Sequence, residues 1–332
     1  MANRQAMIDE IIAKYKAGFT PPERPIGSVV HIETPGRCVL VTGATGSLGS
    51  HIAADLAQRP EVSEVVCPNR LSSTDASLRQ QRSFEARGIY LTPLSKAKLN
   101  IIQTDTSKPL LGLPLETFRY LVERVTHVVH SAWPMSFKRS LSGYEQQFKM
   151  FRNPIYLASV VANYPTRAYK TLVPEQLVTS EAKMICEHIL HETLYRGPDT
   201  FHAMAVRVAQ VSGSTHSGHW NPTEYIAFLV KSSQTLGKLP DLDGTLSWYP
   251  ADEVATTLGD LLMSSTAPNF IGHIENPARQ SWRDTIETLA SSLGISSQDI
   301  VPFEEWLAHV DVRHNNDPQT LQKDTRDDAR RE

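Results

Sequence analysis

The sequence predicts an α/β fold built on a doubly wound parallel sheet, and three observations support this fold class. First, short apolar runs such as RCVLVT do not alternate with polar residues, which is typical of parallel strands buried on both faces. Second, these runs alternate along the chain with longer segments of helical periodicity. Third, the 332 residues are 40% hydrophobic and 21% charged, which is ordinary for a globular protein with a sizeable core.

Composition and charge exclude several classes of protein. The formal net charge of -3 lacks the basic excess of nucleic-acid-binding proteins, so we expect no nucleic-acid partner. No apolar run approaches the ~20 residues that cross a bilayer, and the charged N-terminal segment is unlike a signal peptide. We therefore expect a cytoplasmic protein with no membrane partner. The three cysteines lie in apolar stretches without paired spacing, which predicts reduced thiols and no metal site.

The elements follow in order from the N-terminus. Residues 1–35 are expected to form a helix, with Met7, Ile8, Ile11, Ile12 and Tyr15 on one side, and then a proline-rich linker. A nucleotide-binding domain is expected over 36–212. Its first four strands are predicted at 37–42, 63–70, 99–105 and 126–133, and its helices at 50–60, 78–87, 116–125 and 179–194, with a further strand at 201–213.

The fifth strand of the sheet is the weak point of this pattern. The apolar run Tyr156–Tyr164 suits a strand or the end of a helix, but not both. We therefore expect the central fifth strand to be shortened or missing, unless residues 154–162 fill the gap. A missing central strand would leave the backbone groups of its two neighbours unpaired, which would weaken the fold.

The C-terminal third of the chain differs in composition. Segments of helix, strand, turn and helix predict a smaller α+β substrate-binding part over 213–313. Residues 314–332 are nearly all polar and are expected to form a disordered tail.

Three glycines follow the first strand and open the next helix. Gly43 allows a tight turn, Gly46 allows the backbone to approach a pyrophosphate, and Gly49 allows close packing of helix on strand. The unpaired N–H groups and positive dipole end of that helix suit phosphate. This context predicts a Rossmann-type dinucleotide site, and the contacting residues are expected to be Gly43, Thr45, Gly46, Ser47, Leu48 and Gly49.

The end of the second strand indicates which dinucleotide binds. That strand ends in Asn69-Arg70, where a carboxylate would favour NAD. Arg70 can instead pair with a 2′-phosphate, so we predict NADP, with Arg79 as a further cation. Asp105 after the third strand suits an adenine contact or a turn equally well. Further cofactor contacts are expected after the fourth strand, from Ser131 and Ala132.

The glycine spacing and the later Lys183 resemble extended short-chain dehydrogenases/reductases. The chain is more closely similar to the terminal thioester-reductase domains of fungal nonribosomal-peptide-synthetase-like and aminoadipate-reductase-like enzymes. This resemblance covers most of residues 7–310 and rests on the segments VLVTGATGSLGSHI, VVCPNR, VTHVVHSAWPMSF, FRN, GHWNPTEYI, LGKLPD and WYPADEVA, with MIDEIIAKYKAGFTPP similar to the preceding linker helix.

The resemblance implies an NADPH-dependent reductase that acts on an acyl thioester held by phosphopantetheine on a carrier domain, or on a related small-molecule acyl substrate, in secondary-metabolite biosynthesis. It also implies a catalytic Tyr-x-x-x-Lys pair and a serine or threonine on the fifth strand. Tyr is the proton donor, Lys lowers the pKa of Tyr and binds the nicotinamide ribose, and the hydroxyl holds the carbonyl oxygen.

This sequence departs from that pattern at the catalytic positions. Lys183 is present, but the residue four before it is Thr179, whose aliphatic hydroxyl is a far weaker acid than a phenol. Ser159 suits the catalytic serine only if the YLAS segment is the fifth strand. The candidate catalytic residues are therefore Lys183, Thr179 and Ser159, and two hypotheses stay open: an active reductase, or a nucleotide-binding pseudoenzyme that has lost the catalytic Tyr and the fifth strand.

Overall fold

The computed structural model describes residues 2–19, 36–133, 140–162, 169–176, 181–195, 201–221, 224–266 and 269–316. The chain divides into two compact units. The first contains Met1–His219 and Trp248–Glu275, and the second contains Trp220–Ser247 and Asn276–Glu332. Residues 248–275, which the sequence analysis places in the substrate-binding part, thus return to the first unit. Within the described residues, no helix is sufficiently long and apolar to span a bilayer.

A seven-stranded sheet forms the centre of the first unit, in the order β11-β6-β5-β4-β1-β2-β3. All of its paired strands run parallel, which confirms the predicted fold class. The order reverses between β4 and β1, which makes this pair the topological switch point of the sheet. The strands are β1 (Arg37–Thr42), β2 (Val62–Asn69), β3 (Leu99–Gln103), β4 (His127–His130), β5 (Tyr169–Gln176), β6 (Phe201–Val208) and β11 (Ile271–Ile274).

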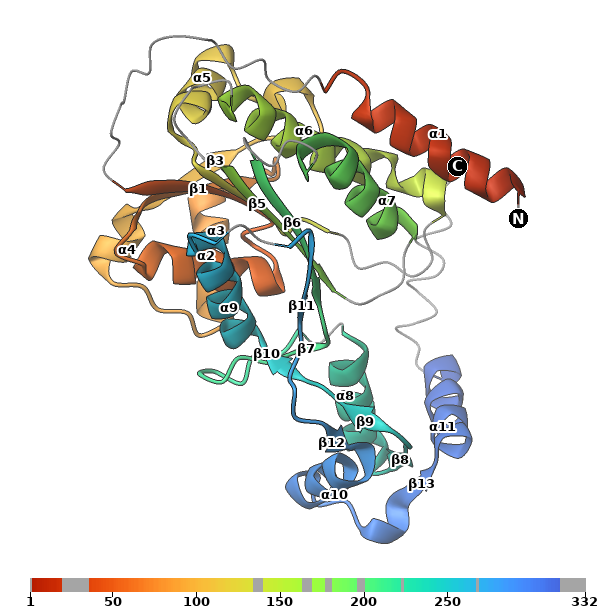
Figure 1. Cartoon of the computed structure of the whole chain (residues 1–332). Helices are drawn as coiled ribbons and strands as arrows, with labels where there is room; N and C mark the ends of the chain where they lie inside the picture. The colour runs from red at the N-terminus through yellow and green to blue at the C-terminus, as the bar shows by residue number, and fades with distance from the viewer. Residues whose placement is uncertain are drawn as a thin grey trace. The chain divides into compact units, whose positions relative to one another are not determined.

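Helices cover both faces of this sheet (Figure 1). One face carries α1 (Ala2–Lys16), α5 (Leu115–Arg124), α6 (Glu145–Ala162) and α7 (Glu181–Leu190), and the other carries α2 (Ser47–Gln58), α3 (Ala76–Ala86), α4 (Pro93–Ala97) and α9 (Ala251–Met263). Short turns of 3-10 helix lie at Pro109–Gly112 and Leu141–Tyr144, and a π-helical turn at His191–Tyr195 extends α7. A two-stranded sheet of β7 (Val211–Ser212) and β10 (Tyr249–Pro250) completes the unit.

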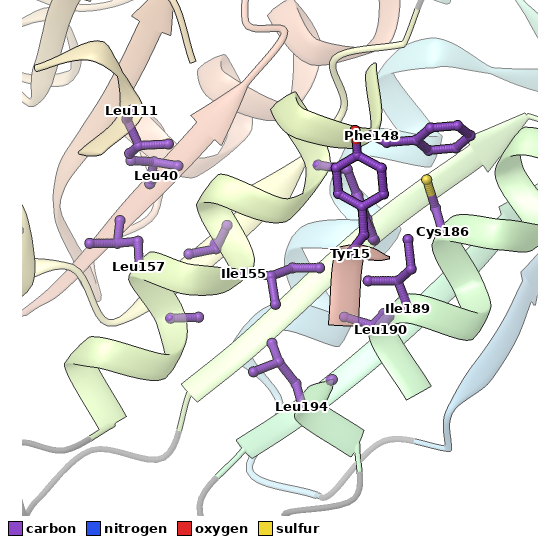
Figure 2. Close-up of a cluster of buried hydrophobic side chains, with 14 of the residues drawn as sticks. Tyr15, Leu40, Leu111, Phe148, Ile155, Leu157, Cys186, Ile189, Leu190 and Leu194 are labelled. Atoms are coloured by element: carbon purple, nitrogen blue, oxygen red, sulfur yellow. The ribbon is translucent and has the colours of Figure 1, made fainter. Parts of the chain in front are cut away.

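A separate buried cluster lies on each face of the sheet. In the cluster beneath α6 and α7, Figure 2 shows apolar side chains of both helices gathered with Leu40 of β1. Tyr15 of α1 belongs to the same cluster, where its ring lies 5.6 Å from that of Phe148. The predicted N-terminal helix is therefore confirmed as α1, and Ile8 and Tyr15 are buried while Met7 is exposed.

The expectation of a shortened or missing fifth strand is wrong for the described residues. Strand β5 has eight residues and pairs with both β4 and β6. Residues 154–162 do not fill this position, because they belong to α6. The backbone groups of β4 and β6 therefore find partners in the segment YKTLVPEQ, which lies later in the sequence than the apolar run at Tyr156–Tyr164.

The second unit is smaller and combines helices with short strands. Its elements are α8 (Tyr225–Leu236), β8 (Leu239–Asp241), β9 (Thr245–Leu246), β12 (Gln280–Ser281), α10 (Trp282–Leu293), β13 (Ile300–Pro302) and α11 (Phe303–Asn316), with a 3-10 turn at Ser297–Asp299. Two small apolar clusters hold it together. Both α8 and α10 end at glycines in the left-handed conformation, Gly237 and Gly294. The tail predicted over 314–332 lies almost wholly outside the described residues, beyond Asn316.

Candidate functional site

A cavity of about 410 Å³ lies at the carboxyl ends of the strands that flank the switch point. Open parallel sheets bind their ligands at this place, because the connections diverge there and leave a crevice. Residues from the ends of β1, β2, β3 and β4 and from α6 line the cavity: Thr42, Gly43, Thr45, Gly46, Pro68, Asn69, Arg70, Thr104, Thr106, Ser131, Ala132, Trp133, Gln146, Gln147 and Met150. All of them belong to the first unit.

The glycine turn between β1 and α2 forms one wall of this cavity. Gly43 has a φ of +75°, and a Cβ there would come within 2.7 Å of the Ser131 backbone. A Cβ on Gly49 would lie 2.1 Å from the carbonyl oxygen of Gly43, so only glycine allows α2 to start this close to β1. Gly46 precedes the first turn of α2 and has no side-chain cap. The helix therefore presents free N–H groups to an anion.

The chemistry of the cavity fits a dinucleotide. The glycine turn supplies backbone donors and the positive end of a helix dipole for a pyrophosphate. On the α6 side, the Oε1 atom of Gln147 is buried and has no hydrogen-bond partner among the described residues. A buried acceptor without a donor is costly, and a ligand hydroxyl or amide would remove that cost.

The cation predicted at the end of β2 is found at the cavity. Arg70 lines it and has no hydrogen-bond or ion-pair partner for its exposed side chain among the described residues. Arg79 does not line the cavity. Its Nη2 atom donates to the carbonyl oxygen of Arg70 and to Oε1 of Gln103, the latter at 3.1 Å, so it supports the backbone at Arg70.

Asp105 forms a turn after β3. Its Oδ1 atom accepts hydrogen bonds from the Ser107 hydroxyl at 2.6 Å and from the Ser107 backbone N–H at 3.1 Å. The hydroxyl bond is the main cause that lowers the pKa of Asp105. Its neighbours Thr104 and Thr106 line the cavity, whereas Asp105 does not.

Ser131 and Ala132 line the cavity as predicted, directly after β4. Trp133 lies beside them and stacks on Tyr144, with ring centroids 5.5 Å apart. On α7, the Nζ atom of Lys183 lies 5.9 Å from the centroid of the Trp133 ring, and the lysine side chain is buried. A cation–π contact of this kind attracts a lysine to the ring face. It places Lys183 next to a wall of the cavity.

Of the other two catalytic candidates, the structure describes Ser159, and this residue does not line the cavity. Ser159 lies on α6, where its hydroxyl donates to the carbonyl oxygen of Tyr156 at 2.7 Å. The condition for its catalytic role, a strand at YLAS, is therefore not met. Thr179 lies outside the described residues.

His130 ends β4 beneath the cavity wall. Its Nδ1 atom lies 2.9 Å from the hydroxyl of Thr42, which lines the cavity, and its ring contacts Phe151 edge-on. Its Nε2 atom is buried without a hydrogen-bond partner among the described residues. Burial lowers the pKa of His130 to about 4, so the ring is neutral near pH 7 and carries a proton on one of its two nitrogens.

Sequence reasoning missed the cavity residues that come from the end of β3 and from α6. Thr104 and Thr106 flank Asp105, and their position at a strand end was a usable signal. Gln146, Gln147 and Met150 come from a helix with no local motif, so only the tertiary structure brings them to the site.

Comparisons with known proteins agree with this geometry. Residues 41–148 match the model of an NAD-binding family described as male sterility protein. Clavatol synthase of Penicillium crustosum is 49% identical over 341 positions, which cover 93% of this chain and 13% of that protein. The citrinin polyketide synthase of Monascus ruber is 48% identical with the same coverage. The chain thus spans 13% of the length of these relatives.

The solved structures give the same fold. The terminal R domain from the myxalamid PKS-NRPS pathway superposes with a TM-score of 0.77 at 19% identity, covering 95% of this chain and 84% of that one. The aligned region of a fungal relative is longer than the part of this chain that aligns with it. The alignment with clavatol synthase has 341 positions, although only 93% of the 332 residues of this chain take part. That relative therefore contains internal residues that this chain lacks.

Proposed function

We propose that this chain, which is similar to the thioester-reductase domains of the extended short-chain dehydrogenase/reductase superfamily, is an NADPH-dependent reductase of an acyl thioester. The substrate would be held by phosphopantetheine on a carrier domain, as part of secondary-metabolite biosynthesis in the cytoplasm. The observation that carries this proposal is the glycine turn, which faces a cavity with Arg70 at one end and Trp133 beside Lys183 at the other. Its relatives among fungal polyketide synthases support a carrier-bound substrate.

Bound NADPH would supply a hydride to the thioester carbonyl carbon. The resulting hemithioacetal anion would then expel the pantetheine sulfur as a thiolate and leave an aldehyde. The chain's own part is to bind and orient: the N–H groups of the turn hold the pyrophosphate, and the Trp133 ring forms a wall where the reacting ends meet. The positive charge of Lys183 would stabilise the oxyanion that develops on the carbonyl.

The choice of NADPH over NADH rests on Arg70. An arginine can form two hydrogen bonds to a 2′-phosphate, and this one has no competing partner among the described residues. Arg79 holds the carbonyl oxygen of Arg70 and so fixes the backbone from which that side chain extends. We therefore assign the discrimination to Arg70 and a supporting role to Arg79.

The test of cofactor binding is a fluorescence titration of the purified chain with NADPH and with NADH. We expect NADPH to bind at least tenfold more tightly. In Arg70→Ala the two affinities should become equal, because only the 2′-phosphate contact is lost. Arg82→Ala, which removes an exposed arginine of α3, is the control and should leave both affinities unchanged. A chain that binds neither cofactor would contradict the proposal.

A nucleotide-binding pseudoenzyme is the second candidate, and two observations favour it. Thr179 stands where the family has its catalytic Tyr, and clavatol synthase contains internal residues that this chain lacks. Here the cavity would bind the dinucleotide without turnover.

The two candidates are distinguished by mixing the chain with NADPH and an acyl-pantetheine thioester. Loss of NADPH absorbance together with an aldehyde trapped as its hydrazone would identify a reductase. Binding without loss of NADPH would identify the pseudoenzyme. In that case Thr179→Tyr should start turnover if only the proton donor is missing, because a phenol is a much stronger acid than an aliphatic alcohol.

A further inference from the structure

The three consecutive carbonyl groups inside the glycine turn all accept hydrogen bonds from buried side chains. Gln80 on α3 donates its Nε2 to the Ala44 oxygen at 2.8 Å. Ser83, one turn further on the same helix, donates its hydroxyl to the Thr45 oxygen at 3.1 Å. Ser50 on α2 lies 2.7 Å from the Gly46 oxygen and 3.0 Å from the Ala44 oxygen, and its single hydroxyl proton serves one of them at a time.

These donors are themselves fixed in place. The Oε1 atom of Gln80 accepts from Nδ2 of Asn69 at 3.1 Å, which sets the direction of the Gln80 amide. The hydroxyl of Ser83 accepts from Nη1 of Arg87 at 2.9 Å and lies 2.8 Å from the hydroxyl of Ser50, so these three side chains form one hydrogen-bond network beside the Thr45 oxygen. Gln80 and Ser83 are 2% and 8% exposed, so water does not compete for these bonds.

The geometry of the peptide bond then determines the direction in which the N–H groups of the turn point. In a trans peptide the C=O of one residue and the N–H of the next point in opposite directions. Because the Ala44 and Gly46 oxygens are held on the α3 and α2 side, the N–H groups of Thr45 and Ser47 point away from it. The Gly46 N–H is used within the turn, by the Gly43 oxygen at 2.8 Å.

We propose that Gln80 and Ser83 are positioning residues that hold the turn so that its N–H groups face the pyrophosphate of the dinucleotide. The proposal rests on the proposed function for the presence of that ligand. Neither residue lines the cavity, so both act through the backbone of the turn. We therefore expect Gln80 and Ser83 to affect the binding of the pyrophosphate, which NADPH and NADH share. The selectivity for NADPH should continue to depend on Arg70.

The test uses Ser83→Ala and Gln80→Met in the full chain, with NADPH and NADH titrated at a temperature where each variant is folded. Each variant should weaken the binding of both cofactors by the same factor, about three- to tenfold, which corresponds to the loss of the one hydrogen bond that each side chain donates to the turn. Gln81→Met is the matched control, since Gln81 is the next residue of α3 and its exposed side chain donates to Glu85 at 2.7 Å. It should change neither affinity.

Ser83→Ala decides the outcome if Gln80→Met does not fold, because it removes one atom and leaves the Asn69 contact intact. Unchanged affinities in Ser83→Ala would overturn the inference, and so would a loss confined to NADPH, which would indicate an effect at Arg70. A lower melting temperature with unchanged affinities would also overturn it, since the residues would then only stabilise the fold. A wild-type chain that binds neither cofactor would instead overturn the proposed function.

Discussion

At the scale of single residues, Gly43 and Gly49 illustrate how a sequence spacing becomes a steric requirement. The two lie on opposite sides of one turn, and a Cβ on Gly49 would approach the Gly43 carbonyl oxygen to 2.1 Å. The sequence predicted both roles, because the strand before them and the helix after them set the context. It could not predict Gln80 and Ser83, because helical periodicity alone does not reveal which buried polar residues meet a distant turn.

Gly49→Ala should therefore destabilise the protein even though alanine favours helices. Overpacking against backbone costs about 1–3 kcal/mol, which lowers the melting temperature by roughly 2–12 °C in a domain of this size. The control is Gly218→Ala, where a φ of +65° is unfavourable for alanine but no atom of the described residues lies within 4 Å of the added Cβ. Its cost should be limited to about 1 kcal/mol of backbone strain. Equal melting temperatures for the two variants would contradict the steric argument.

His130 and His51 give the protein a predictable response to acid. Burial lowers the pKa of each to about 4, below the unfolded value near 6.5. Between pH 4 and 6.5 the unfolded chain therefore binds more protons, so the free energy of unfolding falls as the pH drops through this window. For the fully buried His130 the loss should reach up to about 3 kcal/mol.

Urea unfolding across this pH range provides the measurement. In His130→Gln the stability should depend less steeply on pH, because one of the two neutral histidines is gone. His273→Gln, which replaces an exposed histidine on β11, should leave the slope as in the wild type. An unchanged slope in His130→Gln would show that this ring is protonated as easily in the folded chain as in the unfolded one.

At the scale of elements, β5 and α6 are the two segments whose secondary structure the sequence pattern did not predict. The run at Tyr156–Tyr164 suits strand or helix by composition, and the structure places its residues 156–162 at the end of α6, a helix that also contains Pro154. The segment YKTLVPEQ contains a proline and two charged residues, which argue against a central strand. It nevertheless pairs on both sides, because β4 and β6 would otherwise lack partners. The strand conformation of this segment is therefore determined by pairing with its neighbours and not by local propensity.

An ion pair joins α7, which carries Lys183, to the neighbouring strand β6. The Arg207 guanidinium binds both carboxylate oxygens of Glu187 at 2.7 Å, and Glu187 is only 7% exposed. Arg207→Met would leave that carboxylate buried beside an apolar group, so it should destabilise the protein by about 2 kcal/mol. Lys14→Met removes an ion pair between half-exposed side chains and should cost less than about 0.5 kcal/mol. Urea midpoints that fall equally in both variants would contradict this difference.

At the scale of the whole molecule, the division into units depends on contacts that the sequence does not reveal. The fold class and the position of the nucleotide site followed from strand order and the glycine turn. The return of residues 248–275 to the first unit could not be predicted, because α9 packs on α2, nearly two hundred positions earlier in the chain. A domain boundary that is predicted from composition alone therefore assigns residues 248–275 to the wrong unit.

Since every residue that lines the cavity belongs to the first unit, NADPH should protect that unit in particular. At a hundredfold excess over its dissociation constant, a ligand stabilises the state that binds it by about 2.7 kcal/mol. Hydrogen exchange followed by mass spectrometry should show slower exchange in peptides from 37–69 and 126–133. Peptides from α8, α10 and α11 should change little. Equal protection in both units would mean that the ligand site extends beyond the first.

The N-terminal helix is attached to the first unit by side-chain contacts as well as by the chain that follows it. The helix α1 is held by its own side chains: Arg4 pairs with Glu181 at 2.6 Å, and Ile8 and Tyr15 are buried on the rest of the unit. Its attachment thus does not depend only on the peptide bonds that lead to β1. A protease that cut the chain within residues 20–35 would leave a nicked protein whose first piece stays bound as a peptide ligand, released by dilution and salt and replaceable by a synthetic copy.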